Sequence, residues 1–493
     1  MPVPTPVTVP SSKAFATNHH LRRRNPLTAL GGTAATTTSS SNYTPPLYQK
    51  ILYPSNGSSQ APPRILHSSS HATLDPLILD LIALSLRAFV SPWYNGGISR
   101  DPDKDFLQAV TAVLVQVIQA LEVRLAAVDW TELLLRDVPS VLEDHYRDWD
   151  LAEDKSRGPS AHNLSTEEMF HRLEPHVAIS LGAGTPALPH VDRVYLRTLV
   201  DHVLKLLLPP EDYRAETERA IVREVLVGVV FGTVFGKVAQ PWFLHGVIAR
   251  LLEGREAAAR AARKEPSTPR DSNAPVSPTT ALDQIVSIVA RIPTILATTL
   301  TSISTFVAQA SSTVLPAHYY LSSQPLYSQL SSLVLAILPP SSTLAQAVHF
   351  IGLPLAPMSH ALDAYLYRTV TTSFTTDETV KTVLEGITRG MFPNNGWPAP
   401  KEDDPDLEGQ QELERRCQEA ISRLLPRAPA SFLFPNNDKE EQTPFGQEDP
   451  RLLLARHLVR PLASHVANVH LFVKVLDLVV GKLFPELTAT PED

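Results

Sequence analysis

Residues 195–253 decide the fold, and they read YLRTLVDHVLKLLLPPEDYRAETERAIVREVLVGVVFGTVFGKVAQPWFLHGVIARLLE. The pattern predicts a helix that ends at Pro209 and Pro210, followed by a helix whose charged first half gives way to the apolar run Val225–Phe235. That run must be buried. It is shorter than the roughly 18 to 20 residues needed to cross a bilayer, so we expect a core or cavity helix and no membrane span.

The bulk composition is typical of a folded, intracellular protein. The chain has 493 residues, 43% of them apolar, which favours two or three domains of about 150 residues. Its net charge of -8 argues against nucleic acid as a partner. The single cysteine, Cys417, excludes an internal disulfide and fits a reducing, cytosolic setting. The N-terminus lacks the apolar region of a secretory signal.

Composition divides the chain into segments. Residues 1–72 are rich in Pro, Ser and Thr and lack Asp and Glu, so we expect a disordered arm; its cations leave a membrane or partner tether and a mitochondrial transit segment as alternatives. Apolar positions with helical spacing follow in 73–253, without strand-like alternation. Residues 254–280 are predicted to be a flexible linker, first basic and Ala-rich, then Pro- and Ser-rich.

The segment 281–360 is unusual because no Lys, Arg, Asp or Glu lies between Arg291 and Asp363. Apolar residues keep a helical period opposite Ser and Thr, and they include Ile295, Leu300, Ile303 and Phe306. An uncharged amphipathic helix would bind a curved bilayer through packing defects, with these four residues as the contact. The alternative is a helix buried against the first domain.

Residues 74–253 resemble the PX-associated (PXA) domain of sorting nexins. The resemblance is carried by FVSPWY (89–94), the VDWTELL segment, DHYRDW (144–149), YLRTLVDHVLKLLLPPEDY (195–213), the Arg223-Glu224 pair and Pro241. Residues 361–488 resemble the nexin C-terminal domain through MFPNNGWP, RRCQEAISRLLP and VHLFVKVLDLVVGKLFPEL. We recognise no membrane hairpin, RGS domain or PX domain of the kind that relatives carry.

The resemblance implies an all-α protein in which the PXA and nexin-like domains pack into one helical body with an apolar cavity for lipid. We expect the cavity to be lined by Val225, Val229, Gly232, Val234, Phe235, Leu476 and Val480. Gly228, Gly232 and Gly236 form a stripe that permits close helix packing or leaves room for an acyl chain. Arg223 and Glu224 would meet a phosphate head group or form a structural ion pair, with Asp129 or another helix as partner.

Enzyme chemistry finds little support in the sequence. There is no G-x-S-x-G, P-loop or H-E-x-x-H motif. GAGTPA (182–187) lacks a third glycine and a preceding predicted strand, so we expect a loop. His457, His465 and His470 are too irregularly spaced for a metal site, and Cys417 lacks a histidine partner. We expect no catalytic residue, metal or cofactor.

Two hypotheses about function remain. The first is a non-enzymatic protein that binds or transfers phospholipid or another acyl lipid in trafficking, associated peripherally with endosomal or vacuolar membranes or with contact sites of the endoplasmic reticulum. The second is a scaffold that uses the same fold to hold protein partners at those membranes without carrying lipid. The first predicts an apolar cavity and the second a solid core.

Overall fold

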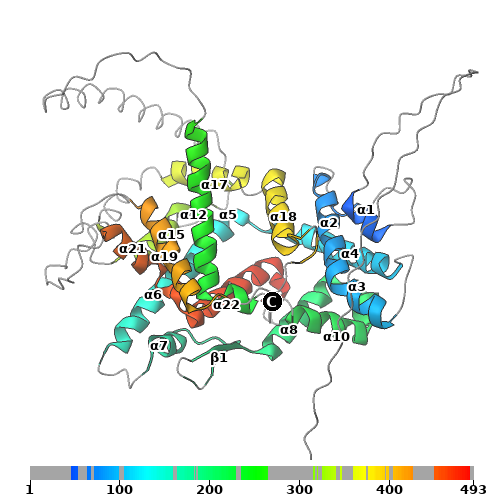
Figure 1. Cartoon of the computed structure of the whole chain (residues 1–493), viewed down its shortest axis with the longest axis horizontal. Coiled ribbons are helices and arrows are strands. Elements are labelled where there is room, and N and C mark those ends of the chain that lie inside the picture. The colour runs from blue at the N-terminus through cyan, green and yellow to red at the C-terminus, as the bar shows by residue number, and fades with distance from the viewer. Residues whose placement is uncertain are drawn as a thin grey trace, which may run out of the picture. The chain divides into compact units, whose positions relative to one another are not determined.

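The fold is described from a computed structural model. It covers residues 46–53, 64–67, 71–98, 105–158, 164–182, 184, 187–228, 235–264, 315–316, 319, 325–339, 345–346, 359–373, 376–394, 396–398, 404–425 and 449–488. These residues lie in one structural unit, Pro46–Asp493. They are almost entirely helical, which confirms the all-α prediction (Figure 1).

The end of the predicted disordered arm is folded. Helix α1 (Leu47–Leu52) packs against α2 (Asp75–Ser85), and Tyr48, Leu52 and Ile65 are buried in a shared core with residues of α4 (Asp105–Ala127). The prediction for 1–72 was therefore wrong for 46–53 and 64–67. The Pro and Ser content, averaged over the whole arm, obscures the local pattern of a short amphipathic helix. The apolar residues of that helix are enough for it to pack into a core.

The helix of α2 does not end at Pro92. It continues as η2 (Leu86–Val90), α3 (Ser91–Trp93) and η3 (Tyr94–Ile98), with π-type turns in η2 and η3. Proline fits because it stands near the start of α3, where its missing N–H is not needed. Tyr94 stacks on Phe106 of α4 with ring centroids 3.9 Å apart, so it serves the core.

Two helical stretches, Asp75–Gly97 and Asp105–Ala127, are long and apolar enough to cross a membrane. The prediction that the chain has no membrane span rested on Val225–Phe235 alone. Only 29% and 17% of their most apolar windows are buried. Length and composition alone do not distinguish a span from a core helix, but both stretches carry apolar surface beyond their core contacts.

The middle of the PXA-like region contains helices and one small hairpin. The elements are α5 (Trp130–Glu132), η4 (Leu133–Asp137), α6 (Val138–Ser156), α7 (Thr166–Leu173), β1 (Ile179–Leu181), β2 (Pro189–Val191), α8 (Arg193–Leu207), α9 (Pro210–Arg214), α10 (Glu216–Val225), α11 (Gly236–Val238) and α12 (Pro241–Lys264). The antiparallel pair β1–β2 flanks GAGTPA, so a strand does precede that loop, contrary to expectation. This strand, β1, pairs with β2 in a hairpin and does not lead into a helix.

Helix α12 extends into the predicted linker. Residues 254–264 are helical, so only the later part of 254–280 remains a candidate linker. The reason is composition, since Ala, Arg, Glu and Lys in EGREAAARAARK are strong helix formers.

The described part of the uncharged segment packs against the first domain. Helix α15 (Leu326–Ile337) lies on α6, where the Gln329 amide donates to Glu143 at 2.6 Å. Leu315, Tyr319 and Leu326 form a cluster with Ala364 of α17 (Ser359–Ser373). Ile295, Leu300, Ile303 and Phe306, the expected membrane contact, lie outside the described residues.

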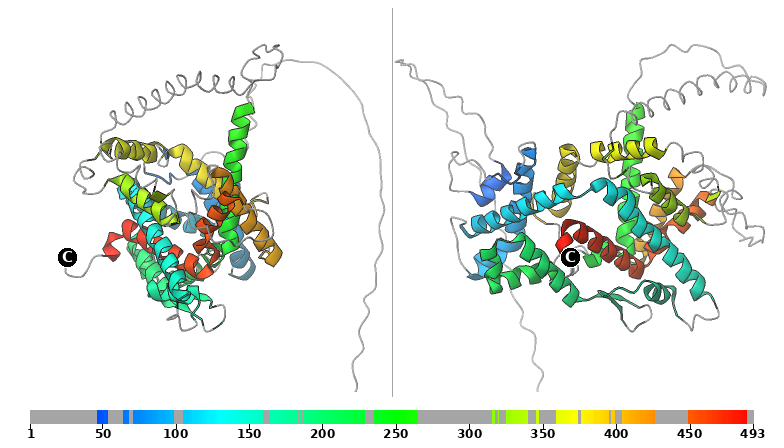
Figure 2. Two further views of the ribbon diagram at one scale, coloured as in Figure 1. Left: turned by 90° about the vertical axis from the view of Figure 1, so that its left-hand side faces the viewer. Right: turned by 180° about the vertical axis from the view of Figure 1, so that it is seen from behind.

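The C-terminal helices pack on both ends of the PXA-like region. They are α18 (Asp377–Met391), α19 (Leu407–Leu424), α21 (Pro450–Val459), η7 (Pro461–Ala463), α22 (His465–Leu483) and η8 (Pro485–Leu487). Helix α18 contacts α2, α19 runs along α12, and α22 contacts α6 and α7 (Figures 1 and 2). The two sequence regions thus share one helical body.

Candidate functional site

Helix α22 changes character along its length. From Val466 to Val473 it is largely buried, and Val469 and Val473 pack with Ala178, Ile179 and Ala239. From Lys474 to Val480 every residue is only half-buried, although most are apolar. The serine at its N-cap, Ser464, accepts from the backbone N–H of Ala467 and fixes where the helix starts. The first half therefore anchors the helix and the second borders a less filled region.

Phe235, one of the residues expected to line the cavity, packs on α22 just before this second half. The ring of Phe235 meets that of Phe472 edge-on, with centroids 5.9 Å apart. Leu476 and Val480 follow Phe472 at intervals of four residues, so they lie along the same side of the helix. All four side chains are half-buried. Phe235 thus packs on α22, and Leu476 and Val480 lie further along that helix; their lining of one cavity stays a prediction.

The other expected lining residues are only partly described. Val225 is the last residue of α10, but its side chain is not described, and Val229, Gly232 and Val234 lie outside the described residues. Their neighbours Leu226 and Val227 pack on α8, in a cluster that Tyr195 shares with the Phe235 cluster. The apolar run therefore begins against α8 and ends against α22.

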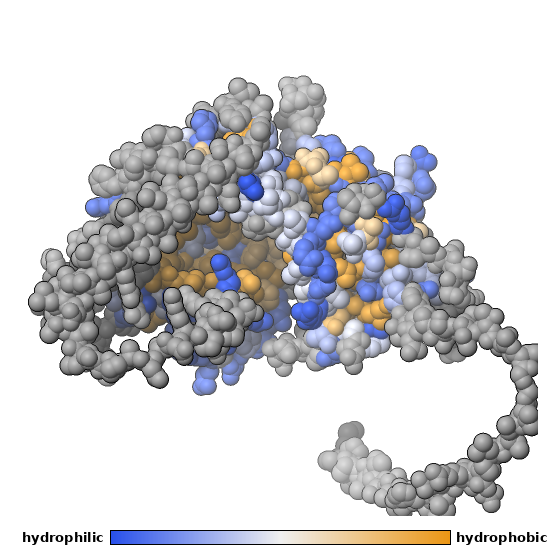
Figure 3. Space-filling view, turned by 90° about the horizontal axis from the view of Figure 1, so that it is seen from above, coloured by the Kyte–Doolittle hydropathy of each residue, from blue (hydrophilic) through white to orange (hydrophobic). Residues whose placement is uncertain are grey.

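Gly228 is exposed and Gly236 is half-buried. A Cβ atom built on Gly228 or Gly236 would meet no other atom within 4 Å. Close helix packing therefore does not explain either glycine. We name this region the α22 seam, comprising Leu226, Gly228, Phe235, Gly236, Phe472, Leu476 and Val480. Figure 3 shows hydrophobic side chains open on one face of the molecule, some of them in a recess.

Ionic and hydrogen-bonded groups tie α22 to residues 174–195. Asp477 accepts hydrogen bonds from the Tyr195 hydroxyl and from His176 Nε2, the latter at 2.9 Å. Lys474 pairs with the buried carboxylate of Glu174. Burial raises the pKa of Glu174 to about 7, with a contribution from Asp148, while Lys474 opposes the rise. These pairs hold α22 at a fixed position beside the seam.

A histidine cluster lies at the buried half of the same helix. His145 of α6 and His470 of α22 are fully buried, and both rings meet Phe170 edge-on at 5.4 and 5.5 Å. His171 Nδ1 lies 3.0 Å from His470 Nε2. Burial, with Lys474 adding to it, lowers the pKa of His145 to about 4. Burial and the neighbouring cations lower the pKa of His470 to about 3, so both rings are neutral at pH 7.

Arg223 and Glu224 both have protein partners. Glu224 receives two hydrogen bonds from Arg197 of α8, each 2.8 Å long. Arg223 contacts Asp201 of α8 at 3.3 Å. Asp129 instead caps α5 and accepts from the Tyr319 hydroxyl at 2.8 Å. The pair therefore connects α10 to α8.

The described residues form no arrangement suited to metal binding, and their one cysteine is not placed for catalysis. Among the described residues, no three His, Cys, Asp or Glu side chains are placed to hold a metal ion. Cys417 is fully buried on α19, and burial raises the pKa of its thiol to about 11, so it is a poor nucleophile there.

Several residues of this site carry no signal in the sequence. Tyr195, His176, Glu174 and Lys474 become partners across about 300 positions of chain, and each alone is an ordinary polar residue in a helix or loop. Tyr195, Lys474 and Asp477 lie in motifs quoted above, but nothing in those motifs predicts which residues become partners.

Residues 71–251 match the PXA domain family. The chain contains a PXA domain. The match confirms the resemblance drawn from the motifs, and its range nearly coincides with 73–253. The similarity of 361–488 to the nexin C-terminal domain stays a prediction.

Relatives share this domain with the chain. PXA domain protein 1 of Schizosaccharomyces pombe is 31% identical over 155 residues, which are 31% of this chain and 29% of that protein. Human sorting nexin-13 is 23% identical over 187 residues, 36% of this chain and 19% of that protein. Mouse sorting nexin-25 is 22% identical over 183 residues, 37% and 20% respectively. The chain thus spans less than a third of each relative's length. No solved structure matches it.

Proposed function

We propose that the protein is a non-enzymatic lipid carrier of intracellular membrane trafficking, which holds the chains of a phospholipid or another acyl lipid in the α22 seam. The observation that supports it most is the row of half-buried apolar side chains on α22, which begins where Phe235 packs on Phe472. Phe235, Phe472, Leu476 and Val480 are apolar yet only half-buried, and a Cβ atom on the half-buried Gly236 would meet no other atom within 4 Å.

The energetics of acyl chains require an apolar site of this kind. Each methylene moved from water to an apolar environment gains about 0.8 kcal/mol, so a two-chain lipid of roughly 30 methylenes does not leave a bilayer without comparable shelter. Because bilayer and seam shelter the chains alike, exchange between them needs no ATP. The Asp477–Tyr195 hydrogen bond joins α22 to α8, and the Lys474–Glu174 pair fixes the position of α22 beside the seam.

The relatives support the cellular setting. Two of them are named sorting nexins, which favours a role in membrane trafficking with peripheral attachment to endosomal membranes. Vacuolar membranes and contacts with the endoplasmic reticulum are narrower forms of the same proposal.

Native mass spectrometry of the full chain, purified from a eukaryotic host without detergent, tests the proposal. We expect a stoichiometric lipid that is lost in Gly236→Leu and Leu476→Trp, which fill the seam. Gly254→Leu is the matched control, because a Cβ at Gly254 of α12 also meets open space. A folded protein without lipid, or one whose lipid persists in both variants, would contradict the proposal and favour the scaffold.

A further inference from the structure

Helix α18 leaves an apolar stripe uncovered. Val380, Val383, Ile387 and Met391 recur at helical spacing and are 37 to 53% exposed. On the adjoining side of the helix, Leu384 packs into the core formed by α1, α2 and α4. The helix therefore rests on the PXA domain along one edge of its apolar face, while the other edge is open.

Two aromatic residues continue this stripe. Phe89 of η2 is 52% exposed and its ring lies 6.3 Å from that of Phe392, which directly follows α18. Trp397 is 51% exposed, and the Arg87 guanidinium lies 4.5 Å from its ring centroid. We call Phe89, Val380, Val383, Ile387, Met391 and Trp397 the α18 face.

Trp397 is held rigidly at the surface. The carbonyl of Gly396 accepts a hydrogen bond from Arg87, and Gly396 has a φ of 80°. A Cβ at this position would come within 2.7 Å of Arg87 and 2.8 Å of Leu84. The turn thus requires glycine, and it fixes an exposed indole that does not serve the core.

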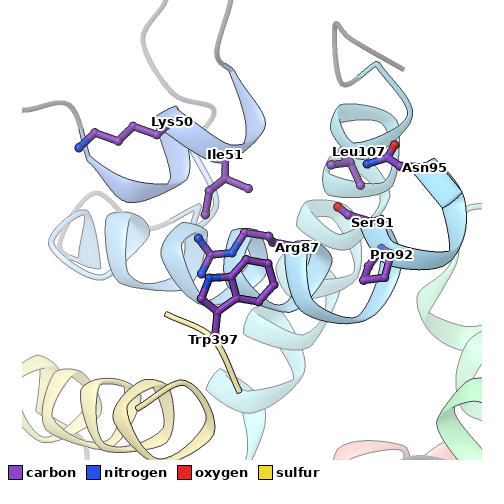
Figure 4. A pocket seen from close by; sticks show the side chains of 8 residues that line it. All are labelled: Lys50, Ile51, Arg87, Ser91, Pro92, Asn95, Leu107 and Trp397. Carbon is purple, nitrogen blue, oxygen red and sulfur yellow. The ribbon is translucent and has the colours of Figure 1, made fainter. Parts of the chain in front are cut away.

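A pocket of about 450 Å³ lies beside Trp397, within the size range of small-molecule sites. Its lining consists of Lys50, Ile51, Arg87, Ser91, Pro92, Asn95, Leu107 and Trp397. Figure 4 shows the Arg87 guanidinium lying against the indole, while Lys50 extends outward from α1. Lysine has a flexible stem that lets its ammonium reach a ligand at the pocket mouth.

The charge of this pocket is one-sided. Lys50 and Arg87 are its only charged side chains, and no carboxylate lines it. Neither cation forms an ion pair with a described residue, whereas Arg124, Arg460 and Lys474 all do. Ser91 and Asn95 add polar groups. Such a lining suits a phosphate, which takes cations and neutral donors together.

We propose that the α18 face docks on a bilayer that contains anionic phospholipid, with a lipid phosphate at the Lys50–Arg87 pocket. Tryptophan favours the bilayer interface, and the aliphatic stripe supplies the apolar area that an interfacial helix buries. Helix α18 carries three acids, Asp377, Glu378 and Glu385, against two bases, Lys381 and Arg389, so its own charge would not attract an anionic membrane. The cations of the pocket supply that attraction.

This docking site shares no residue with the α22 seam and does not rest on lipid carriage. A scaffold would need it equally. Vesicle binding can therefore fail while lipid remains bound in native mass spectra, or the reverse.

Flotation of the full chain with vesicles tests the proposal. We expect binding to vesicles of phosphatidylcholine containing phosphatidic acid, and weaker binding to phosphatidylcholine alone. Ile387→Glu should weaken binding about tenfold or more, and the milder Val383→Ser several-fold, because both remove apolar contact. Leu424→Glu is the matched control, since Leu424 of α19 is 58% exposed and should be neutral. Circular dichroism verifies that each variant is folded.

Lys50→Gln tests the pocket. It should weaken binding to the anionic vesicles about fivefold and leave binding to the neutral vesicles unchanged, as expected for one lysine at a membrane surface. Stabilisation by inorganic phosphate without vesicle binding would assign the pocket to a soluble phosphate compound and overturn membrane docking. Three other results would also overturn membrane docking: wild-type protein that does not float with the vesicles, a folded Ile387→Glu variant that floats normally, or self-association of the protein that is lost only in Ile387→Glu.

Discussion

The C-terminal part of the chain meets the PXA domain in two contrasting ways. Helix α22 is anchored by its buried half, where histidines lie among aromatic rings. Beyond that half, Lys474 forms an ion pair with Glu174, and Asp477 accepts hydrogen bonds from Tyr195 and His176. Helix α18 has no buried residue and leaves apolar side chains exposed. Buried polar groups specify one position for α22, whereas an exposed apolar stripe is available to something outside the chain. The contrast separates a structural contact from an interaction surface.

Val473→Asp should give the largest effect. Val473 is 1% exposed in the α22 core, and an unpaired carboxylate there should lower the free energy of unfolding by about 4 kcal/mol or more. Urea denaturation measures this. If the variant were as stable as wild type, α22 would not be anchored in the PXA domain.

Asp477→Ala should have the next largest effect. It removes the acceptor shared by Tyr195 and His176, and we expect a loss of about 2 kcal/mol, typical of hydrogen bonds to a charged group. Tyr195→Phe should lose about half as much. A double-mutant cycle that gave no coupling between the two would show that the pair does not hold α22.

Acid should weaken the α22 contact. In the unfolded chain, histidines bind protons below about pH 6.5. In the folded protein, His145 and His470 stay neutral down to their lowered pKa values of about 4 and about 3. The free energy of unfolding therefore falls as the pH falls from 6.5 towards 4. The limit is about 1.4 kcal/mol per pH unit for each histidine. His171, whose pKa burial also lowers, adds to the fall.

Glu174 acts in the opposite sense. Its raised pKa makes the folded state bind the extra proton between about pH 4.5 and 7, so acidification over that window offsets part of the histidine loss. The other titratable groups facing the cluster are Lys474, His176, Asp477 and Asp148. We therefore expect the pH dependence to be steepest below 4.5. His145→Gln should flatten it, and an unchanged slope would exclude this histidine as a cause.

Gly396→Ala should destabilise by about 1 to 2 kcal/mol, because alanine disfavours a φ of 80° and its Cβ would displace Arg87 and Leu84. Thermal unfolding measures the loss. Alanine at full stability would mean that the turn is not fixed, and Trp397 would no longer be a rigid part of the α18 face.

Val383→Ser should have the smallest effect on stability, within about 0.5 kcal/mol, because Val383 is 53% exposed. The same urea series measures it. A loss of several kcal/mol would show that the α18 stripe is covered within the protein, and the contrast with α22 would disappear.

The sequence predicted the features of the fold that local residue patterns determine. Helical spacing and motif order were enough for the all-α class and the PXA domain. They failed at α1, because the composition of residues 1–72 outweighed four apolar positions in Leu47–Leu52. They also failed at residues 254–264, because a charged, Ala-rich run is both linker-like and helix-forming.

The site was foreseeable only where apolar periodicity marked it. Phe235, Leu476 and Val480 were predicted from hydrophobic runs in two regions that the family resemblance brings together, and their role as a lipid lining stays a prediction. The partners of Asp477 and the His145–Phe170–His470 arrangement were not predicted, because they depend on tertiary contacts between residues about 300 positions apart. The α18 face was missed because an amphipathic helix reads the same whether its apolar stripe is buried or exposed.

Photo-crosslinking with a diazirine-bearing phospholipid tests the central claim most directly. The full chain is loaded from vesicles, separated from them, irradiated and digested, and the labelled peptides are identified by mass spectrometry. We expect label on residues 226–235 and 472–480, which border the α22 seam, and its loss in Gly236→Leu. Label confined to the α18 face, or none on vesicle-free protein, would contradict lipid carriage by the seam.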